Sequence, residues 1–315
     1  MSFIVPATIG EARPDLAQCY QEYDASGVQF AYKVAMPFAN VDEQRATIPC
    51  EKPDDMLRIE NMERGPGGHY NRVNTRLGSV SYACEGKGLE FPIHLGDGRL
   101  FQLPSLAKEE AAARQLRTKV DLWYEYEVGA AIFGVGGAQA LNVAWDLPAT
   151  SQPLVDIQNA SLSVQNATGV TPNTLILNLR NWNYLVQSAS VKAWFPGAVM
   201  ITRELIAQSL AGMYGITRIA VSSARHNTAA EGLAMVGASV LPDNLVAVAY
   251  CAESDMTPYT AMSCGRIFNW VEDSAAPLIL EQYMWEPTRS LILRVRNNVD
   301  VNLWNPNLVK LITVD

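Results

Sequence analysis

The sequence predicts an α+β protein in which one long helix is followed by an α/β region and a strand-rich end. Three observations predict this class. Residues 105–133 have the composition and apolar spacing of one continuous helix. Residues 170–262 alternate between helix-like and strand-like stretches, and residues 278–314 contain strand-like runs separated by polar turns.

Composition and charge exclude several classes of protein. The chain has 315 residues, 49% hydrophobic and 18% charged, and a chain of this size buries a core without disulfide staples. An intrinsically disordered chain, a fibre and a disulfide-held miniprotein are therefore excluded. The net charge of -8 argues against a surface that grips nucleic acid tightly.

Cysteine usage and the lack of long apolar runs indicate a reducing compartment. Five cysteines lie far apart without a CxxC pair, which favours reduced thiols over a disulfide framework or a zinc site. The N-terminus has no signal-peptide features, and no uncharged run of about 18 apolar residues occurs. We expect a protein made in a cytoplasm and not bound to a membrane.

The first part of the chain predicts strands and loops. Residues 27–49 combine β-branched and aromatic residues with two prolines, which predicts short strands and turns in an extended arm. Residues 51–76 carry five acids and five bases around the turn sequence GPGGH at 65–69, so this stretch buries little and should protrude. In residues 79–85, Val80, Tyr82 and Cys84 alternate as in a half-buried strand.

The long helix has clear signals at both ends. Ser105 follows Pro104 and is a candidate N-cap, while Glu109 and Glu110 lie early in the helix, where its dipole favours anions. Leu116, Val120 and Trp123 share one face. The glycine-rich stretch GVGGAQA at 134–140 resembles a phosphate loop only faintly, and because it follows a helix we interpret it as a helix stop.

The remaining elements are predicted from similar signals. A second helix is expected at 151–168, with Ser151 as its cap, Pro153 in its first turn and Gly169 at its end. Further helices are expected at 180–187 and 202–215, and further strands at 174–179, 216–223 and 244–251.

No motif indicates catalysis. His226 with Ser222 or Ser223 and Asp243 offers the residue types of a hydrolase triad, but no GxSxG elbow is present, and three histidines give few candidates for a base or a metal ligand. We expect no catalytic, cofactor-binding or metal-binding residue. In residues 51–76 the interspersed acids and bases favour a charge-complementary protein contact over nucleic-acid binding.

The order of these features resembles one family. The stretches that carry the resemblance are VQFAYKVAMPFANVDEQRATIP, RGPGGHYNRV, SVSYACEGKGLEFPI, EEAAARQLRTKVDLWYEYEVGAAIF and DIQNASLSVQNATGVTPNTLIL. In this order they resemble the tailed-phage major capsid proteins of the Hong Kong 97 (HK97-like) fold type. The resemblance covers nearly the whole chain, and the last third matches mainly in its pattern of strands.

The resemblance implies a division of the chain and a structural function. It implies an N-terminal arm at 1–50, an extended E-loop hairpin at 51–80, a peripheral domain with a long spine helix at 81–169, an α/β axial domain at 170–262, and strands returning to both domains at 263–315. Such subunits form hexamers and pentamers of an icosahedral phage head around double-stranded DNA, without tight sequence-specific binding. The implied location is the virion, assembled in a host bacterial cytoplasm.

The resemblance also implies partners and contact residues. Separate scaffolding and portal proteins are expected, as are decoration proteins where a phage has them. The Lys–Asn crosslink of some relatives is not expected, because nothing singles out a partner for Lys52. E-loop residues should meet acids on the spine helix of an adjacent subunit; the loop residues are Arg58, Glu60, Arg64, Arg72 and Arg76, and the helix acids are Glu109, Glu110 and Asp121.

Two other functions are kept as alternatives. An encapsulin-type nanocompartment shell resembles the same fold and would enclose a protein cargo instead of DNA. A cytoplasmic α/β enzyme of unknown reaction represents a different class and would need a concave site with converging titratable groups.

Overall fold

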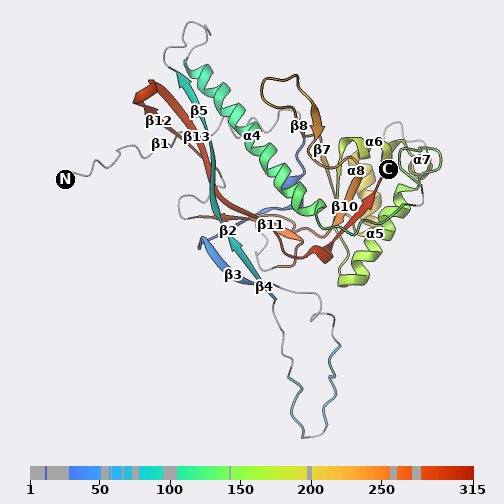
Figure 1. Cartoon of the computed structure of the whole chain (residues 1–315). Helices are drawn as coiled ribbons and strands as arrows, with labels where there is room; N and C mark the ends of the chain where they lie inside the picture. The colour runs from blue at the N-terminus through green and yellow to red at the C-terminus, as the bar shows by residue number, and fades with distance from the viewer. Residues whose placement is uncertain are drawn as a thin grey trace.

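The computed structural model of the chain describes residues 11–12, 28–50, 57, 59–65, 67–72, 78–94, 105–141, 143–196, 201–255, 261–271 and 278–315. Two sheets organise these residues, and the long helix α4 lies alongside both of them (Figure 1). Among the described residues, no helix is long and apolar enough to cross a bilayer.

The larger sheet has six strands and is built around β13. The strands follow the order β1-β12-β13-β11-β2. Strand β5 lies off this path and pairs antiparallel with residues Ser290 to Val299 of β13. Their bounds are β1 Glu11–Ala12, β2 Phe38–Val41, β5 Glu85–His94, β11 Gly265–Trp270, β12 Ile279–Trp285 and β13 Ser290–Leu303. The strand-rich end that the sequence predicts is therefore confirmed, with β13 as its longest strand.

The smaller sheet has four strands in the order β14-β10-β6-β7, with β6 and β7 parallel. Their bounds are β6 Thr174–Asn178, β7 Arg218–Ser222, β10 Leu245–Ala249 and β14 Val309–Thr313. In β6, Leu175 and Leu177 face a cluster formed with helices, while Ile176 faces the core shared with α4. Both faces of this sheet are therefore covered, which explains why every residue of β6 is buried.

Helices α5 to α8 cover one face of the smaller sheet. They are α5 Pro153–Thr168, α6 Leu179–Gln187, α7 Ala189–Trp194 and α8 Arg203–Tyr214. The sequence predicts α5, α6 and α8 to within two residues, but it does not predict α7. Gly169 ends α5 with φ 70°, as expected. The family resemblance implies that residues 151–168 belong to the peripheral domain, whereas Leu154 and Ile157 of α5 pack against the smaller sheet.

The expected N-cap of α5 is wrong. Gln152 occupies the cap position without a side-chain hydrogen bond to the helix. Ser151 is buried instead, and its hydroxyl donates to Ser188 Oγ at 3.2 Å. Its carbonyl accepts hydrogen bonds from Ser188 and Ser190. Ser151 therefore joins the start of α5 to the start of α7.

Helix α4 spans Ser105–Phe133, the bounds that the sequence predicts. The predicted capping role of the Ser105 side chain lies outside what the structure describes. The buried face includes apolar side chains that repeat every four residues, namely Leu116, Val120, Tyr124, Val128 and Ile132. The glycine-rich stretch ends the helix as expected, since Gly136 and Gly137 have φ values of 74° and 65°.

Residues 31–41 belong to the core, which the expectation of an extended arm does not foresee. Tyr32–Ala35 form the single helical turn α2, and Ala31, Tyr32 and Met36 are buried. The Ala31 and Tyr32 N–H groups each donate to Glu125 Oε2 of α4 at 2.9 Å. Because Glu125 satisfies these donors, a turn of only four residues is stable here.

A two-stranded ribbon carries the long loop. Strand β3, Arg45–Cys50, pairs with β4, Gly78–Ala83, and residues 51–77 connect them. The predicted alternation is confirmed, because Val80, Tyr82 and Cys84 are buried between exposed neighbours. The Tyr82 ring stacks on Phe268 of β11 with centroids 4.6 Å apart, which fixes the ribbon to the larger sheet.

Candidate intersubunit interface

The loop between β3 and β4 extends away from the two sheets (Figure 1). At its base, Leu57 lies against Gly169, where a Cβ atom would meet Leu57 Cδ2. Further out, Ile59, Met62 and Tyr70 are 98%, 93% and 74% exposed. Large apolar side chains gathered on one protruding segment are typical of a surface that another protein covers.

Contacts within the loop give its outer part a defined shape. Arg64 Nε donates to Gly68 O at 2.6 Å, and the Arg64 guanidinium lies 4.3 Å from the centre of the Tyr70 ring. Asn71 Nδ2 donates to Asn61 O at 2.6 Å, joining the two arms of the loop. The predicted turn is confirmed by the Gly68 N–H to Gly65 O bond of 2.9 Å. The apolar side chains are therefore displayed on a partly organised hairpin.

Five of the eight predicted contact residues are at least partly exposed in the structure. Glu60, Arg64 and Arg72 are exposed on the loop, and Glu109 and Glu110 are partly exposed near the start of α4. In Figure 1 the loop and the start of α4 lie at opposite ends of the subunit, so they can meet only between two copies. Arg58 and Arg76 lie outside the described residues.

Asp121 is not available for such a contact, which corrects the prediction. It is 2% exposed, and its Oδ2 accepts from Arg117 Nε at 2.7 Å. Its Oδ1 accepts from the Tyr32 hydroxyl at 2.8 Å. Burial raises the pKa of Asp121, and the Arg117 guanidinium offsets only part of that shift. Asp121 therefore stabilises the subunit itself by holding α2 against α4.

A groove of about 590 Å³ lies beside α4 and was not predicted. Its lining comes from β5, α4 and β13 and includes Lys87, Leu89, Lys119, Val120 and Trp123. The Lys87 ammonium lies 4.6 Å from the centre of the Trp123 ring. The groove combines an apolar floor with two cationic side chains. Sequence reasoning missed it because its parts lie on strands and a helix that are far apart in the chain.

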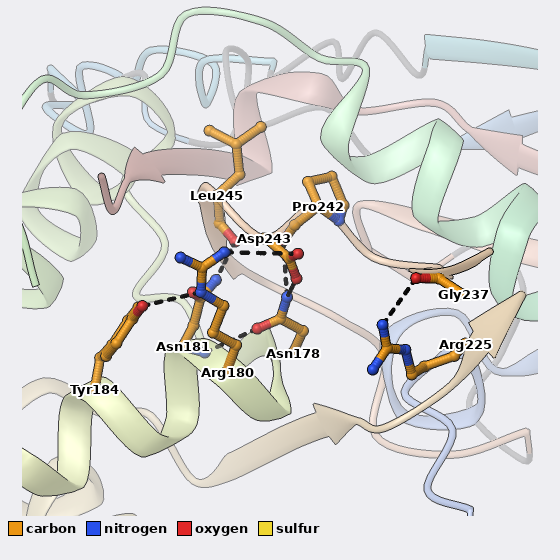
Figure 2. Close-up of polar contacts among 9 residues, drawn as sticks. All are labelled: Asn178, Arg180, Asn181, Tyr184, Arg225, Gly237, Pro242, Asp243 and Leu245. Carbon is orange, nitrogen blue, oxygen red and sulfur yellow. Dashed lines mark hydrogen bonds and ion pairs between the residues drawn. The ribbon is translucent and has the colours of Figure 1, made fainter. Parts of the chain in front are cut away.

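A polar cluster occupies the end of β6, where α6 begins (Figure 2). Asn178 caps α6, since its Oδ1 accepts from Asn181 N–H at 2.8 Å. Its Nδ2 donates to Asp243 Oδ1 at 2.5 Å. Arg180 Nε donates to the Tyr184 hydroxyl at 2.9 Å, and Arg180 Nη1 lies 3.8 Å from Asp243 Oδ2. Asp243 is thus part of a helix-capping network.

The residues of the imagined hydrolase triad are not assembled. Ser222 hydrogen-bonds the Glu125 carboxylate, and Ser223 Oγ accepts from Gln29 N–H at 2.9 Å. His226 lies on the short strand β8, Arg225–Asn227, where its ring meets Tyr126 edge-on at 6.5 Å. Within the described ranges, no three His, Cys, Asp or Glu residues gather as a metal site would require.

Comparison with known proteins identifies the fold. The sequence matches no protein-family model and no curated protein sequence. A phage-related protein from Bordetella bronchiseptica RB50 is 17% identical, with a TM-score of 0.69 over 97% of this chain and 98% of that chain. The capsid of cyanophage P-SCSP1u is 10% identical, with a TM-score of 0.56 over 99% and 92% of the two chains.

A virus-like particle from Pyrococcus furiosus is similar to the same extent. It is 12% identical, with a TM-score of 0.56 over 95% of this chain and 98% of that chain. All three similarities extend over nearly the full length of both chains, as the sequence resemblance implies. The chain therefore has the HK97-like fold of tailed-phage major capsid proteins.

Proposed function

We propose that this chain is the major capsid protein of a tailed phage, a structural protein and not an enzyme. Many copies would assemble as hexamers and pentamers into an icosahedral shell around double-stranded DNA. The observation that carries the proposal is the similarity, over nearly the full length, to a phage-related protein and to a cyanophage capsid chain. The exposed apolar loop supports it, because such a loop is suited to bind a neighbouring copy.

The outer loop would supply both affinity and register to the contact. Burial of Ile59, Met62 and Tyr70 would stabilise it by about 25 cal/mol per Å² of apolar surface removed from water. Exposed charge pairs contribute only about 0.2–1 kcal/mol each, so Glu60, Arg64 and Arg72 would mainly set orientation. Glu109 and Glu110 of the adjacent α4 are candidate partners for the two arginines.

The groove beside α4 is a candidate receiving surface for the apolar side chains. Leu89, Val120 and Trp123 offer an apolar lining, while Lys87 and Lys119 could meet the loop acids. The same two surfaces repeat on every subunit, so each copy can both insert a loop and receive one. Contacts of this head-to-tail kind close into rings when the rotation between subunits allows it.

The two sheets support a division of the subunit into two domains. We propose the six-stranded sheet with α4 as the peripheral domain, and the four-stranded sheet with α5 to α8 as the axial domain. Residues 51–80 would be the E-loop. Assembly would take place in the host bacterial cytoplasm with separate scaffolding and portal proteins, and the product would be the virion shell.

Electron microscopy of the purified protein tests the proposal most directly. Expressed with the scaffolding protein encoded beside it, if one exists, the chain should form closed particles of uniform size. Repeated weak contacts make the shell stable even though each pair is modest. A protein that stays monomeric under all such conditions would refute a shell role.

The similarity to a virus-like particle keeps an encapsulin-type shell as the second candidate. Both candidates predict particles, so their contents separate them. Particles isolated from the native source should protect DNA from nuclease if the phage proposal is right. Particles that contain a protein cargo and no protected DNA would favour the nanocompartment.

A further inference from the structure

Two buried cysteines lie side by side where the two sheets meet. Cys251 follows β10 of the smaller sheet, and Cys264 precedes β11 of the larger sheet. Both are fully buried, and their Sγ atoms are 3.6 Å apart. A disulfide requires about 2.05 Å, so a small movement of the two side chains would bring them to bonding distance.

The backbone holds both residues in this arrangement. Cys264 N–H donates to Tyr250 O at 2.9 Å, which ties the two segments together. Cys251 N–H donates to Asn173 Oδ1 at 2.9 Å, and Ala252 N–H donates to Ser263 Oγ at 3.1 Å. These bonds fix the main chain on both sides of the pair, so the thiols remain neighbours in the folded subunit.

The surroundings of the two thiols differ in a way that suits reaction between them. Either thiol can donate to the other. When Cys264 donates, this hydrogen bond and the nearby Arg218 cation outweigh the effect of burial and lower the pKa of Cys251. Arg218 is held in place by bonds to Cys251 O and Ala252 O of 2.8 and 2.9 Å. The same donation, together with burial, raises the pKa of Cys264. Cys251 is therefore the better nucleophile of the two.

We propose that Cys251 and Cys264 form a reversible disulfide inside the folded subunit, with hydrogen peroxide as the oxidant. The Cys251 thiolate attacks one peroxide oxygen, the O–O bond breaks, and hydroxide leaves as Cys251 becomes a sulfenic acid. The Cys264 sulfur then attacks the Cys251 sulfur, and the hydroxyl leaves as water with the Cys264 proton. The first hydroxide takes up the proton that Cys251 lost on ionisation. Two thiols are thus oxidised and one peroxide is reduced to two waters.

The disulfide would join the two sheets covalently. The cysteines are 13 positions apart in the sequence, and a loop of this length closed in the unfolded chain should raise the unfolding midpoint by roughly 5 °C. This inference does not depend on shell formation, because the pair lies within one subunit. It can therefore be tested on unassembled protein.

The test is peroxide titration of the folded, full-length protein, followed by alkylation, digestion and mass spectrometry. We expect a peptide pair joined through Cys251 and Cys264, an unchanged circular dichroism spectrum, and release of both thiols by dithiothreitol. The exposed Met62 and Met235 report whether the oxidant acts, since both should become sulfoxides. If these methionines are oxidised while Cys251 and Cys264 stay reduced, and are therefore both alkylated, the proposal is overturned.

Two variants separate the pair from other thiols. Cys84→Ala removes a buried thiol in another cluster and should keep the disulfide and the rise in unfolding midpoint. Cys264→Ala should lose both and leave Cys251 at the sulfenic or sulfinic stage. If Cys264→Ala does not fold, the peptide map of the wild-type protein still decides. Oxidation of wild-type Cys251 to sulfinic acid without a disulfide would also refute the proposal.

Discussion

Charged and aromatic side chains occur both in the loop between β3 and β4 and in the middle of α4. In the described part of the loop they are exposed, whereas several of those in α4 are buried. In the loop, Arg64 and Tyr70 are exposed and contact one another. In α4, Asp121 and Glu125 are buried and bind α2, about ninety positions earlier in the sequence. Charge density alone therefore does not reveal whether a segment binds its own subunit or another copy. What decides is whether the folded chain brings a partner to it.

Removal of the outer part of the loop should have the largest effect. Replacement of residues 59–72 by a short Gly-Ser linker, keeping Leu57 against Gly169, should abolish complete shells and leave the unfolding midpoint unchanged. The reason is that the replaced apolar side chains contribute little to the subunit's own core. Electron microscopy and thermal unfolding give the two readouts.

A double substitution tests whether the apolar side chains of the loop are themselves required. Ile59→Ser with Met62→Ser keeps the loop length and should lower the yield of shells without affecting the isolated subunit. An isolated subunit that unfolds after loop replacement, or normal shells built from it, would show that the loop is not an intersubunit arm.

The second test removes a buried charge from α4. Glu125→Ala leaves the Ala31 and Tyr32 N–H groups buried without their acceptor, so we expect a loss of roughly 2–4 kcal/mol in the free energy of unfolding. Urea unfolding measures it. Glu127→Ala, in the same helix but partly exposed, should change stability by less than about 0.5 kcal/mol. Equal effects of the two variants would contradict the role of Glu125.

The third and smallest effect is a difference in pH dependence between two buried carboxyl groups. Burial raises the pKa of Glu125 above its ordinary value of 4.5. The folded chain thus binds this proton more tightly than the unfolded chain. Wild-type stability relative to Glu125→Gln should therefore rise as the pH falls from the raised pKa towards 4.5.

Glu281 should give the opposite sign. Burial raises its pKa, but hydrogen bonds from Arg294 and Arg296 outweigh that effect and hold the pKa below 4.5. Wild-type stability relative to Glu281→Gln should be fully present above pH 4.5 and should be lost as the pH falls through the lowered pKa. Thermal unfolding across this range checks both signs, and parallel curves for the two variants would contradict the assignment.

The sequence was sufficient to predict helices and strands where the pattern of apolar residues is local and periodic. The bounds of α4 follow from its unbroken helical spacing and terminal glycines, and the alternation in β4 follows from Val80 and Tyr82. The turn α2 escaped prediction because its stability comes from Glu125, which lies 94 positions later. Ser151 was misjudged for a similar reason, since its partner Ser188 lies on another element.

The candidate site was predicted only in part. The protruding loop follows from its composition, and its exposed Glu60 and Arg72 agree with that expectation. The burial of Asp121 and the groove beside Trp123 depend on how α4 packs against α2 and β5. No pattern within α4 distinguishes Asp121 from an exposed acid, because tertiary contacts decide its burial.

The parallel pairing of β2 with β11 sets the order in which a nascent chain can fold. Phe38 lies opposite Ile267, and Asn269 Nδ2 donates to Asn40 Oδ1 across 229 positions of sequence. On the ribosome, β2 emerges early and its partner strand emerges near the end of synthesis. The pairing of β2 with β11 therefore cannot form until most of the chain has been synthesised. Until then the edge of β2 has no partner strand. During synthesis this unpaired strand edge can pair with other chains, so we expect chaperones to reduce aggregation of the newly made protein.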